Sequence, residues 1–252
     1  MPGKFVIFAC YWNDMYWLEA SLRHLLYWEP DEIYLAEGCW DSKYPERSTD
    51  GTRKHLEEWA KGRDNTFIID NKQTHKYREN QAETCNAVLQ TSELKAGDWI
   101  MYHASDVFYF KYDIDRYKRY MNIGSFDYPI YSIWNFWDSI TEYYPHRTKQ
   151  APNLPQKVIK GAKFVPTCQL TIGGKLYYQS NQARGMKVPT IQFHYEGLRE
   201  EERLRQKYGV GDRQSPVTWN NGIKLKKRTK YTGGHPEFAI PVLKQRCFYE
   251  EI

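Results

Sequence analysis

The first half of the chain alternates short apolar runs with segments whose apolar residues recur at helical spacing. The apolar runs predict strands at residues 4–11, 32–36, 66–70 and 99–102. The helical spacing predicts helices at residues 13–28, 52–61 and 78–94. This alternation predicts an α/β fold, in which a mostly parallel sheet is flanked by helices on both faces.

The second half has a less regular pattern and predicts an irregular α+β part. Strands are expected at residues 127–137 and 190–194, and further strands at 157–178 joined by a Gly173–Gly174 hairpin turn. A charged helix is expected at residues 200–208 and a last helix at 236–246. Between them, residues 213–232 are rich in Lys and Arg and predict a loop or flap.

Composition narrows the class of protein only moderately. The 252 residues carry 36 basic and 31 acidic side chains, a mild excess of +5 that suits an anionic nucleotide or nucleic acid without requiring either. Aromatic residues reach 16%, a content that suits a sugar or base site but also an ordinary core. The cysteines are five and dispersed, which argues against a disulfide framework or a zinc site. With no signal peptide and no long apolar stretch, we expect a cytoplasmic protein.

Polar clusters follow three of the predicted strands at the point where each strand ends. They are Asn13–Asp14, Glu37–Gly38 and Ser105–Asp106. Because the carboxyl ends of parallel strands meet at one edge of a sheet, where α/β proteins bind ligands, we expect the binding site there.

Several motifs in order carry a resemblance to a known family. Ser-Thr-Asp-Gly-Thr at 48–52 opens a helix after the strand that ends in Glu37–Gly38, and Gly-Asp-Trp-Ile at 97–100 precedes Asp-Val-Phe-Tyr at 106–109. Phe-His-Tyr at 193–195 and the Gly-Gly-His-Pro of 233–236 follow. The chain thus resembles family-2 glycosyltransferases of the A-type (GT-A) fold, of the bacterial and phage type, well over residues 1–110 and patchily beyond.

The resemblance implies an enzyme that moves a hexose or pentose from a nucleotide-diphosphate sugar to an acceptor hydroxyl, with inversion. Residues 1–110 would bind the donor, and residues 111–252 would bind the acceptor and supply a C-terminal flap, within one compact domain. A glycan, a lipid-linked sugar, a protein and a hydroxymethylated base in phage DNA are all open as acceptors.

A divalent metal, Mn²⁺ or Mg²⁺, is implied by the family but with an incomplete motif. The family's Asp-x-Asp reads Ala104-Ser105-Asp106, so Asp106 matches the final Asp and Ala104 replaces the first. The later metal-binding His of the family matches His194. His103 is a further imidazole, although strand alternation points it away from Ala104.

The resemblance also implies the remaining site residues. The donor-binding set is Tyr11, Asn13, Glu37, Asp50, Arg78, Asn86 and Asp106, with Lys76 as an alternative to Arg78. Glu37 would accept from the base or ribose, and Ser48 or Asp50 would also cap the helix that follows. The catalytic set is Asp106, Asp138 and Glu196, with Glu142 as a rival general base. The basic run 224–230 would contact the diphosphate or a polyanionic acceptor.

Two other functions compete with the transferase. A non-catalytic carbohydrate- or nucleic-acid-binding module would explain the missing first Asp. A nucleotidyltransferase would share strand order and metal use, but it normally has a Gly-rich loop after the first strand, where residues 10–13 contain no glycine.

Overall fold

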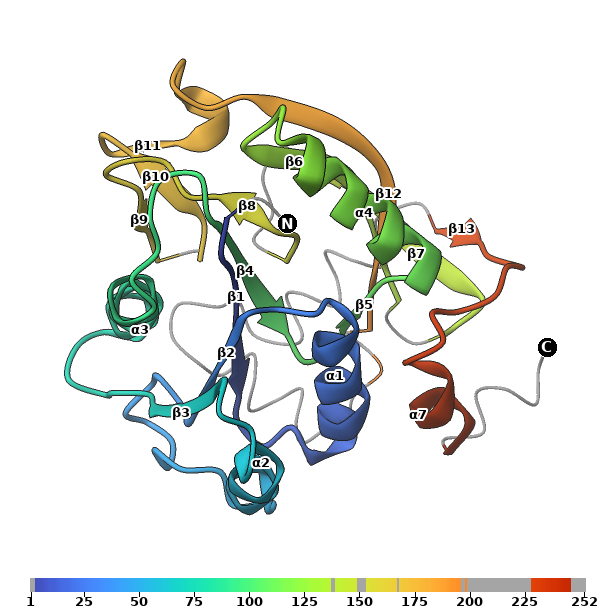
Figure 1. The fold of residues 1–252 in the computed structure, drawn as a ribbon. Coiled ribbons are helices and arrows are strands. Elements are labelled where there is room, and N and C mark those ends of the chain that lie inside the picture. Colours follow the sequence, from blue (N-terminus) through green and yellow to red (C-terminus); the bar gives the residue numbers. More distant parts are fainter. Residues whose placement is uncertain are drawn as a thin grey trace.

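A five-stranded sheet forms the centre of the molecule (Figure 1). The computed structural model describes residues 3–136, 139–148, 153–166, 168–195, 198 and 228–245. The strand order is β3-β2-β1-β4-β8, with the first four strands parallel and β8 antiparallel to β4. The strands are β1 (Phe5–Tyr11), β2 (Glu32–Glu37), β3 (Thr66–Asp70), β4 (Trp99–Ala104) and β8 (Gln156–Lys157). The predicted α/β sheet is therefore confirmed.

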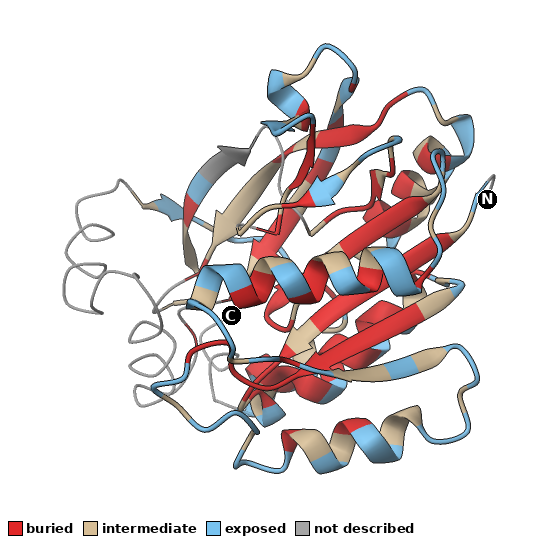
Figure 2. Ribbon diagram, turned by 90° about the vertical axis from the view of Figure 1, so that its left-hand side faces the viewer, coloured by how far each residue is buried: buried red, intermediate tan, exposed pale blue. Residues whose placement is uncertain are grey.

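Helices cover both faces of this sheet because β1 is apolar on both sides. They are α1 (Met15–Tyr27), α2 (Thr52–Ala60), α3 (Tyr77–Thr91) and α4 (Lys111–Ile123). Phe5 and Ile7 pack with side chains of α1, α2 and α4, whereas Val6 and Phe8 pack with α3. A small sheet backs the α3 side, and its strands are β9 (Lys163–Phe164), β10 (Leu170–Ile172) and β11 (Lys175–Leu176). Figure 2 shows the buried residues concentrated on these strands and on the inner faces of the helices.

A second five-stranded sheet continues directly from the first. Its order is β13-β7-β6-β12-β5. The strands are β5 (Val107–Phe108), β6 (Tyr128–Asn135), β7 (Glu142–Thr148), β12 (Gly185–His194) and β13 (Thr229–Lys230). Only Ser105 and Asp106 separate β4 from β5, so the chain passes from one sheet into the other at Asp106. Aromatic side chains of this sheet pack against α1 and against α7 (Ile240–Gln245).

The second half differs from its prediction in several elements, among them β13, which lies in a segment predicted as a loop. Helix α4 was not anticipated, although Ile114, Tyr117 and Met121 form its buried stripe and Gly124 ends it at φ 66°. Strand β7 was also missed, and the last helix begins at Ile240 and not at residue 236. The hairpin turn is confirmed, since Gly173 and Gly174 join β10 to β11 at φ 56° and 76°.

Two predicted elements lie wholly or mostly outside the described residues, namely the charged helix at 200–208 and the flap at 213–232. Within the described part of the chain, none of the helices combines the length and the apolar character needed to span a membrane.

Candidate functional site

The carboxyl edge of the first sheet collects the predicted strand-end carboxylates. Tyr11 at the tip of β1 is in register with Glu37 on β2, and Cys10 is in register with Ala104 on β4. Strands in a sheet lie about 4.8 Å apart, so the tips of β2 and β4 flank the tip of β1 at about 10 Å from each other. Glu37 and the turn that carries Asp106 therefore belong to one edge.

Hydrogen bonds join the Ser-Thr-Asp-Gly-Thr turn of residues 48–52 to the turn between β1 and α1. Ser48 Oγ accepts from the backbone N–H of Asn13 at 2.9 Å, and Asn13 Oδ1 accepts from the Thr49 N–H at 2.8 Å. Asn13 adopts φ 49°, a left-handed conformation that asparagine tolerates better than most residues. These contacts place Asn13 at the carboxyl edge and hold the 48–52 turn beside it.

Asp50 joins two helix starts in this turn. Its Oδ2 accepts from the N–H of Met15, the first residue of α1, and its Oδ1 accepts from the N–H of Thr52, the first residue of α2, both at 3.0 Å. These two amides have no partner within their own helices, so the carboxylate satisfies both. Asp50 thus bonds the first amide of each helix from outside the N-cap positions, which are Asp14 for α1 and Gly51 for α2, so neither Ser48 nor Asp50 is the N-cap residue that was predicted.

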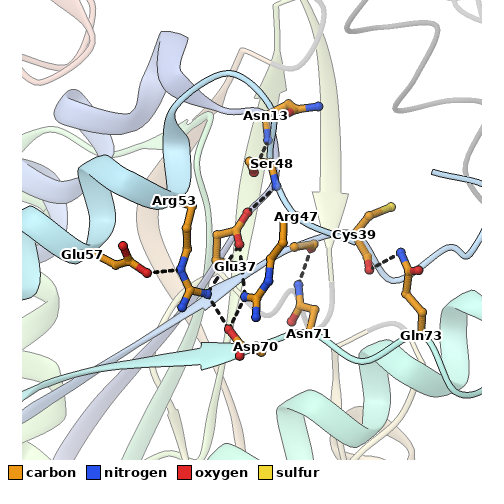
Figure 3. A network of polar contacts seen from close by, with 11 residues as sticks. Asn13, Glu37, Cys39, Arg47, Ser48, Arg53, Glu57, Asp70, Asn71 and Gln73 are labelled. Carbon is orange, nitrogen blue, oxygen red and sulfur yellow. Dashed lines mark hydrogen bonds and ion pairs between the residues drawn. The ribbon is translucent and has the colours of Figure 1, made fainter. Parts of the chain in front are cut away.

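Glu37 lies at the centre of a charged network (Figure 3). Its side chain is fully buried, and Oε1 accepts from the Ser48 N–H at 2.8 Å. Its Oε2 lies 3.6 Å from a guanidinium nitrogen of Arg47 and 3.6 Å from one of Arg53. Both guanidinium groups also donate to Asp70, which ends β3. The carboxyl edge at β2 and β3 therefore holds two carboxylates balanced by two arginines.

The ion pairs of this network fix the ionisation of Asp70. The hydrogen bond from Arg47 and the contacts with Arg53 hold the pKa of Asp70 well below its ordinary value. The same hydrogen bond to Asp70 raises the pKa of the Arg47 guanidinium. Sequence reasoning missed Arg47, Arg53 and Asp70, although Asp70 ends a predicted strand as Glu37 does and pairs with it in register.

Asp106 meets His194 where the two sheets join. The Asp106 side chain is almost fully buried, and its Oδ1 lies 3.6 Å from His194 Nε2. His194 ends β12 and pairs in register with Val107 of β5, the residue that follows Asp106. The backbone N–H of Tyr195 also donates to the carbonyl of Asp106 at 2.9 Å. The two residues that the resemblance assigned to a metal are thus brought together from distant parts of the chain.

Asn135 orients this histidine and was missed by the sequence reasoning. His194 Nδ1 lies 2.9 Å from Asn135 Oδ1, and Asn135 and His194 are in register at the ends of the parallel strands β6 and β12. No local signal marks Asn135, because the predicted strand ran to residue 137 and the pairing of β6 with β12 is set by the tertiary structure.

His103 and Tyr11 point into the core below the edge. Tyr11 Oη lies 2.9 Å from Ser21 Oγ, which lies 3.0 Å from His103 Nε2. Both side chains are buried, so the tip of β1 presents the backbone of Tyr11 to the edge, while its phenol packs beneath. Burial lowers the pKa of His103 to about 3. The neighbouring buried imidazole of His24 has its pKa lowered by burial and then by His103.

The remaining donor-binding predictions lie on α3. Asn86 Nδ2 donates to the carbonyl of Phe164 at 3.0 Å, and its Oδ1 accepts from the Phe164 N–H at 2.9 Å, so its amide fastens β9 to the helix. Arg78 is exposed in the first turn of α3, and Lys76 is exposed immediately before that helix. The donor-binding roles of these residues stay predictions.

Two predicted catalytic residues, Asp138 and Glu196, lie outside the described residues, as do residues 224–227 of the basic run. The rival base Glu142 is described, and its Oε2 lies 3.0 Å from Arg228 Nη1. Thr229 and Lys230 of the run form β13.

Two of the described residues, Asp106 and His194, are of types that can bind a divalent cation. An Asp oxygen and a His nitrogen suit Mn²⁺, whereas Mg²⁺ prefers oxygen alone. Among the side chains that the structure describes, no group of three or more His, Cys, Asp or Glu gathers in a way that would hold a metal. Asp106 and His194 therefore form a two-residue set, to which water or a bound diphosphate would have to add.

Comparisons with known proteins give a distant structural likeness. No family model matches the sequence, and no curated protein matches it. A crystal structure of S. aureus TarS 1-349 aligns at 13% identity and TM-score 0.48, covering 77% of this chain and 60% of that one. TarS 1-349 in complex with UDP-GlcNAc aligns at 15% identity and TM-score 0.39, covering 53% of this chain and 35% of that one.

A 4-diphosphocytidyl-2C-methyl-D-erythritol synthase aligns at 12% identity and TM-score 0.38, covering 89% of this chain and 98% of that one. This chain spans between 35% and 60% of the length of the two TarS 1-349 chains. At these TM-scores the likeness assigns neither a family nor a function, so the functional argument depends on the site itself.

Proposed function

We propose that this protein is a glycosyltransferase that moves a sugar from a nucleotide-diphosphate sugar to an acceptor hydroxyl. The observation that carries the proposal is the contact between Asp106 and His194 at the junction of the two sheets, with 3.6 Å between Oδ1 and Nε2. It lies at the carboxyl edge where α/β sheets bind ligands. The same edge carries the Ser-Thr-Asp-Gly-Thr turn of residues 48–52, whose sequence resembles that of family-2 transferases. Fold class alone would not support the proposal, because one fold carries many functions.

In this proposal, different residues of the carboxyl edge bind different parts of the donor. Asn13 and Asp50 would lie on the side of the base and ribose, where carboxylate and amide oxygens accept from N–H and hydroxyl groups. Glu37 is buried beneath this side and would support it through Ser48, Arg47 and Arg53. Asp106 and His194 lie on the side of the diphosphate. A divalent cation held there would neutralise the charge that develops on the leaving diphosphate.

In this proposal, residues 111–252 supply the general base and determine the face of the sugar that the acceptor hydroxyl attacks. Asp138 and Glu196 remain our candidates to accept the proton of the acceptor hydroxyl, with inversion at the sugar. The acceptor is a hydroxyl on a glycan or on a hydroxymethylated DNA base. A DNA acceptor requires extrusion of the base from the duplex and gives binding that weakens steeply with salt, whereas a neutral glycan gives neither.

A thermal-shift screen of nucleotide sugars, with and without Mn²⁺, tests the proposal. We expect one class of donor to raise the melting temperature, more so with Mn²⁺, because a ligand that binds only the folded state stabilises it. Incubation of that donor with the protein should then release free sugar into water or transfer it to an acceptor.

Two outcomes of these assays support the competing functions. Pyrophosphate release from a nucleoside triphosphate and a sugar phosphate would identify a nucleotidyltransferase. Binding of a glycan or nucleic acid, with no binding of any nucleotide sugar, would identify a non-catalytic module and refute the proposal.

A further inference from the structure

We propose that Asn135 is a positioning residue that holds His194 in the tautomer with its proton on Nδ1, so that the lone pair of Nε2 is directed at Asp106. The inferred role in sugar transfer rests on the proposed function, whereas the tautomer can be measured without it. The observation is the 2.9 Å contact between His194 Nδ1 and Asn135 Oδ1. In a neutral imidazole one nitrogen donates and the other accepts, so the partner of one nitrogen decides the state of the other.

The orientation of the Asn135 amide follows from its second contact. Its Nδ2 donates to the backbone carbonyl of Tyr144 at 3.3 Å. If the amide were turned over, its oxygen would face that carbonyl, and two acceptors would be opposed at hydrogen-bond distance. The Tyr144 carbonyl therefore assigns Oδ1 to the side of His194, and an oxygen there requires a proton on His194 Nδ1.

The backbone keeps these three groups in place. Asn135 pairs in register with Tyr144 on the antiparallel strand β7 and with His194 on the parallel strand β12. The N–H of Phe136, the next residue, donates to the carbonyl of His194 at 2.9 Å. Asn135 is thus held between two strands, and its side chain links the carbonyl of one to the imidazole of the other.

The Nδ1 tautomer places an imidazole lone pair between His194 and Asp106. With its proton on Nδ1, neutral His194 turns the lone pair of Nε2 toward the Asp106 carboxylate, whose Oδ1 is 3.6 Å away. A lone pair and a carboxylate repel each other unless positive charge lies between them or His194 is itself protonated. Asn135 therefore orients His194 so that its Nε2 and the Asp106 carboxylate can bind a cation together, as outer-shell partners of metal-binding histidines do.

Nitrogen-15 NMR of the histidine side chains, at a pH where the imidazoles are neutral, tests the tautomer. Assignment through the loss of signals in His194→Gln identifies the His194 resonances. We expect the wild-type protein to carry the proton on Nδ1 and Asn135→Ala to shift toward the form with the proton on Nε2. Asn135→Asp keeps an acceptor oxygen and should retain the wild-type form. Ser132→Ala, on the same strand, is the matched control and should leave the His194 signals unchanged.

Titration with Mn²⁺ alone provides the second measurement. We expect Asn135→Ala to lose about 10- to 100-fold in affinity, the range typical of outer-shell substitutions, and Asn135→Asp to lose less. A wild-type proton on Nε2, or an Asn135→Ala spectrum identical to wild type, would overturn the proposal. Failure of the proposed transferase function would appear instead as absent donor binding, with the Nδ1 tautomer still present.

Discussion

Asp106 and His194 face each other across the junction of two sheets, with 3.6 Å between the carboxylate Oδ1 and the imidazole Nε2. Their contact arises because β5 follows Asp106 directly and pairs with the end of β12, where His194 lies. This pair is the part of the site on which the proposed function depends most.

Substitution Asp106→Asn should remove turnover while preserving the fold. Asparagine has nearly the same shape but no charge, so it binds a cation more weakly and cannot balance a protonated His194. We expect turnover to fall about 100-fold or more, with a melting temperature close to that of the wild-type protein. Sugar transfer and thermal unfolding measure the two effects. Asp115→Asn on α4, which removes a carboxylate bonded to Tyr27, is the control; wild-type turnover in Asp106→Asn would remove our central assignment.

Substitution Glu37→Gln should weaken both folding and donor binding. The buried carboxylate of Glu37 faces Arg47 and Arg53, each at 3.6 Å. Its loss leaves Arg47 with Asp70, and Arg53 with Asp70 and the exposed Glu57. We expect a loss of about 1–3 kcal/mol in the free energy of unfolding, measured with urea, and a weaker affinity for the nucleotide sugar.

Glu57→Gln is the matched control for Glu37, because Glu57 contacts Arg53 from an exposed position one helical turn along α2. An exposed pair of this kind contributes little, so we expect a change within about 0.5 kcal/mol and unchanged donor affinity. Equal losses of stability and of donor affinity in the two variants would show that the burial of Glu37 does not increase its contribution.

Substitution Asp50→Ala should destabilise the start of two helices at once. The carboxylate accepts from the first amides of α1 and α2, at Met15 and Thr52. Loss of a helix cap costs about 0.5–2 kcal/mol, and we expect a total toward the upper end of that range. Asp50→Asn retains one acceptor oxygen and should have an intermediate effect. Urea unfolding of both variants provides the measurement, and a fully stable Asp50→Ala would contradict the double cap.

The buried histidines should make the protein sensitive to acid. The pKa of His103 falls to about 3 in the folded state from an ordinary value of 6.5, and that of His24 is also lowered. The unfolded chain therefore takes up protons below about pH 6.5 that the folded protein does not. Stability is fully present above that pH and is lost as pH falls toward 3, by about 1.4 kcal/mol per pH unit for each such proton.

Urea unfolding between pH 7 and pH 4 checks this window. We expect His103→Gln to have a shallower loss of stability with falling pH than the wild-type protein, because one of the buried imidazoles with a lowered pKa is gone; His24 and His235 remain. His75→Gln, which removes an exposed imidazole, is the control. Parallel curves for His103→Gln and wild type would contradict the assignment.

The amino-acid sequence by itself predicted the first sheet closely. Apolar runs such as that of β1 and helical spacing such as that of α1 are local signals, because the same few side chains both form the element and bury its face. The second half was predicted less well. Most residues of helix α4 are polar, so its apolar stripe of Ile114, Tyr117 and Met121 is difficult to recognise in the sequence. Strand β7 also escaped prediction, because it contains few aliphatic residues.

Only the tertiary structure decided which polar groups meet. The sequence indicated Glu37, Asp106 and His194 as separate strand-end residues, but it could not show that Arg47, Arg53 and Asp70 surround the first or that Asn135 orients the last. Those contacts join residues far apart along the chain, and they depend on strand order and register, which local patterns do not encode. Local sequence therefore determines the individual helices and strands, whereas the electrostatics of the site depend on how the two sheets join.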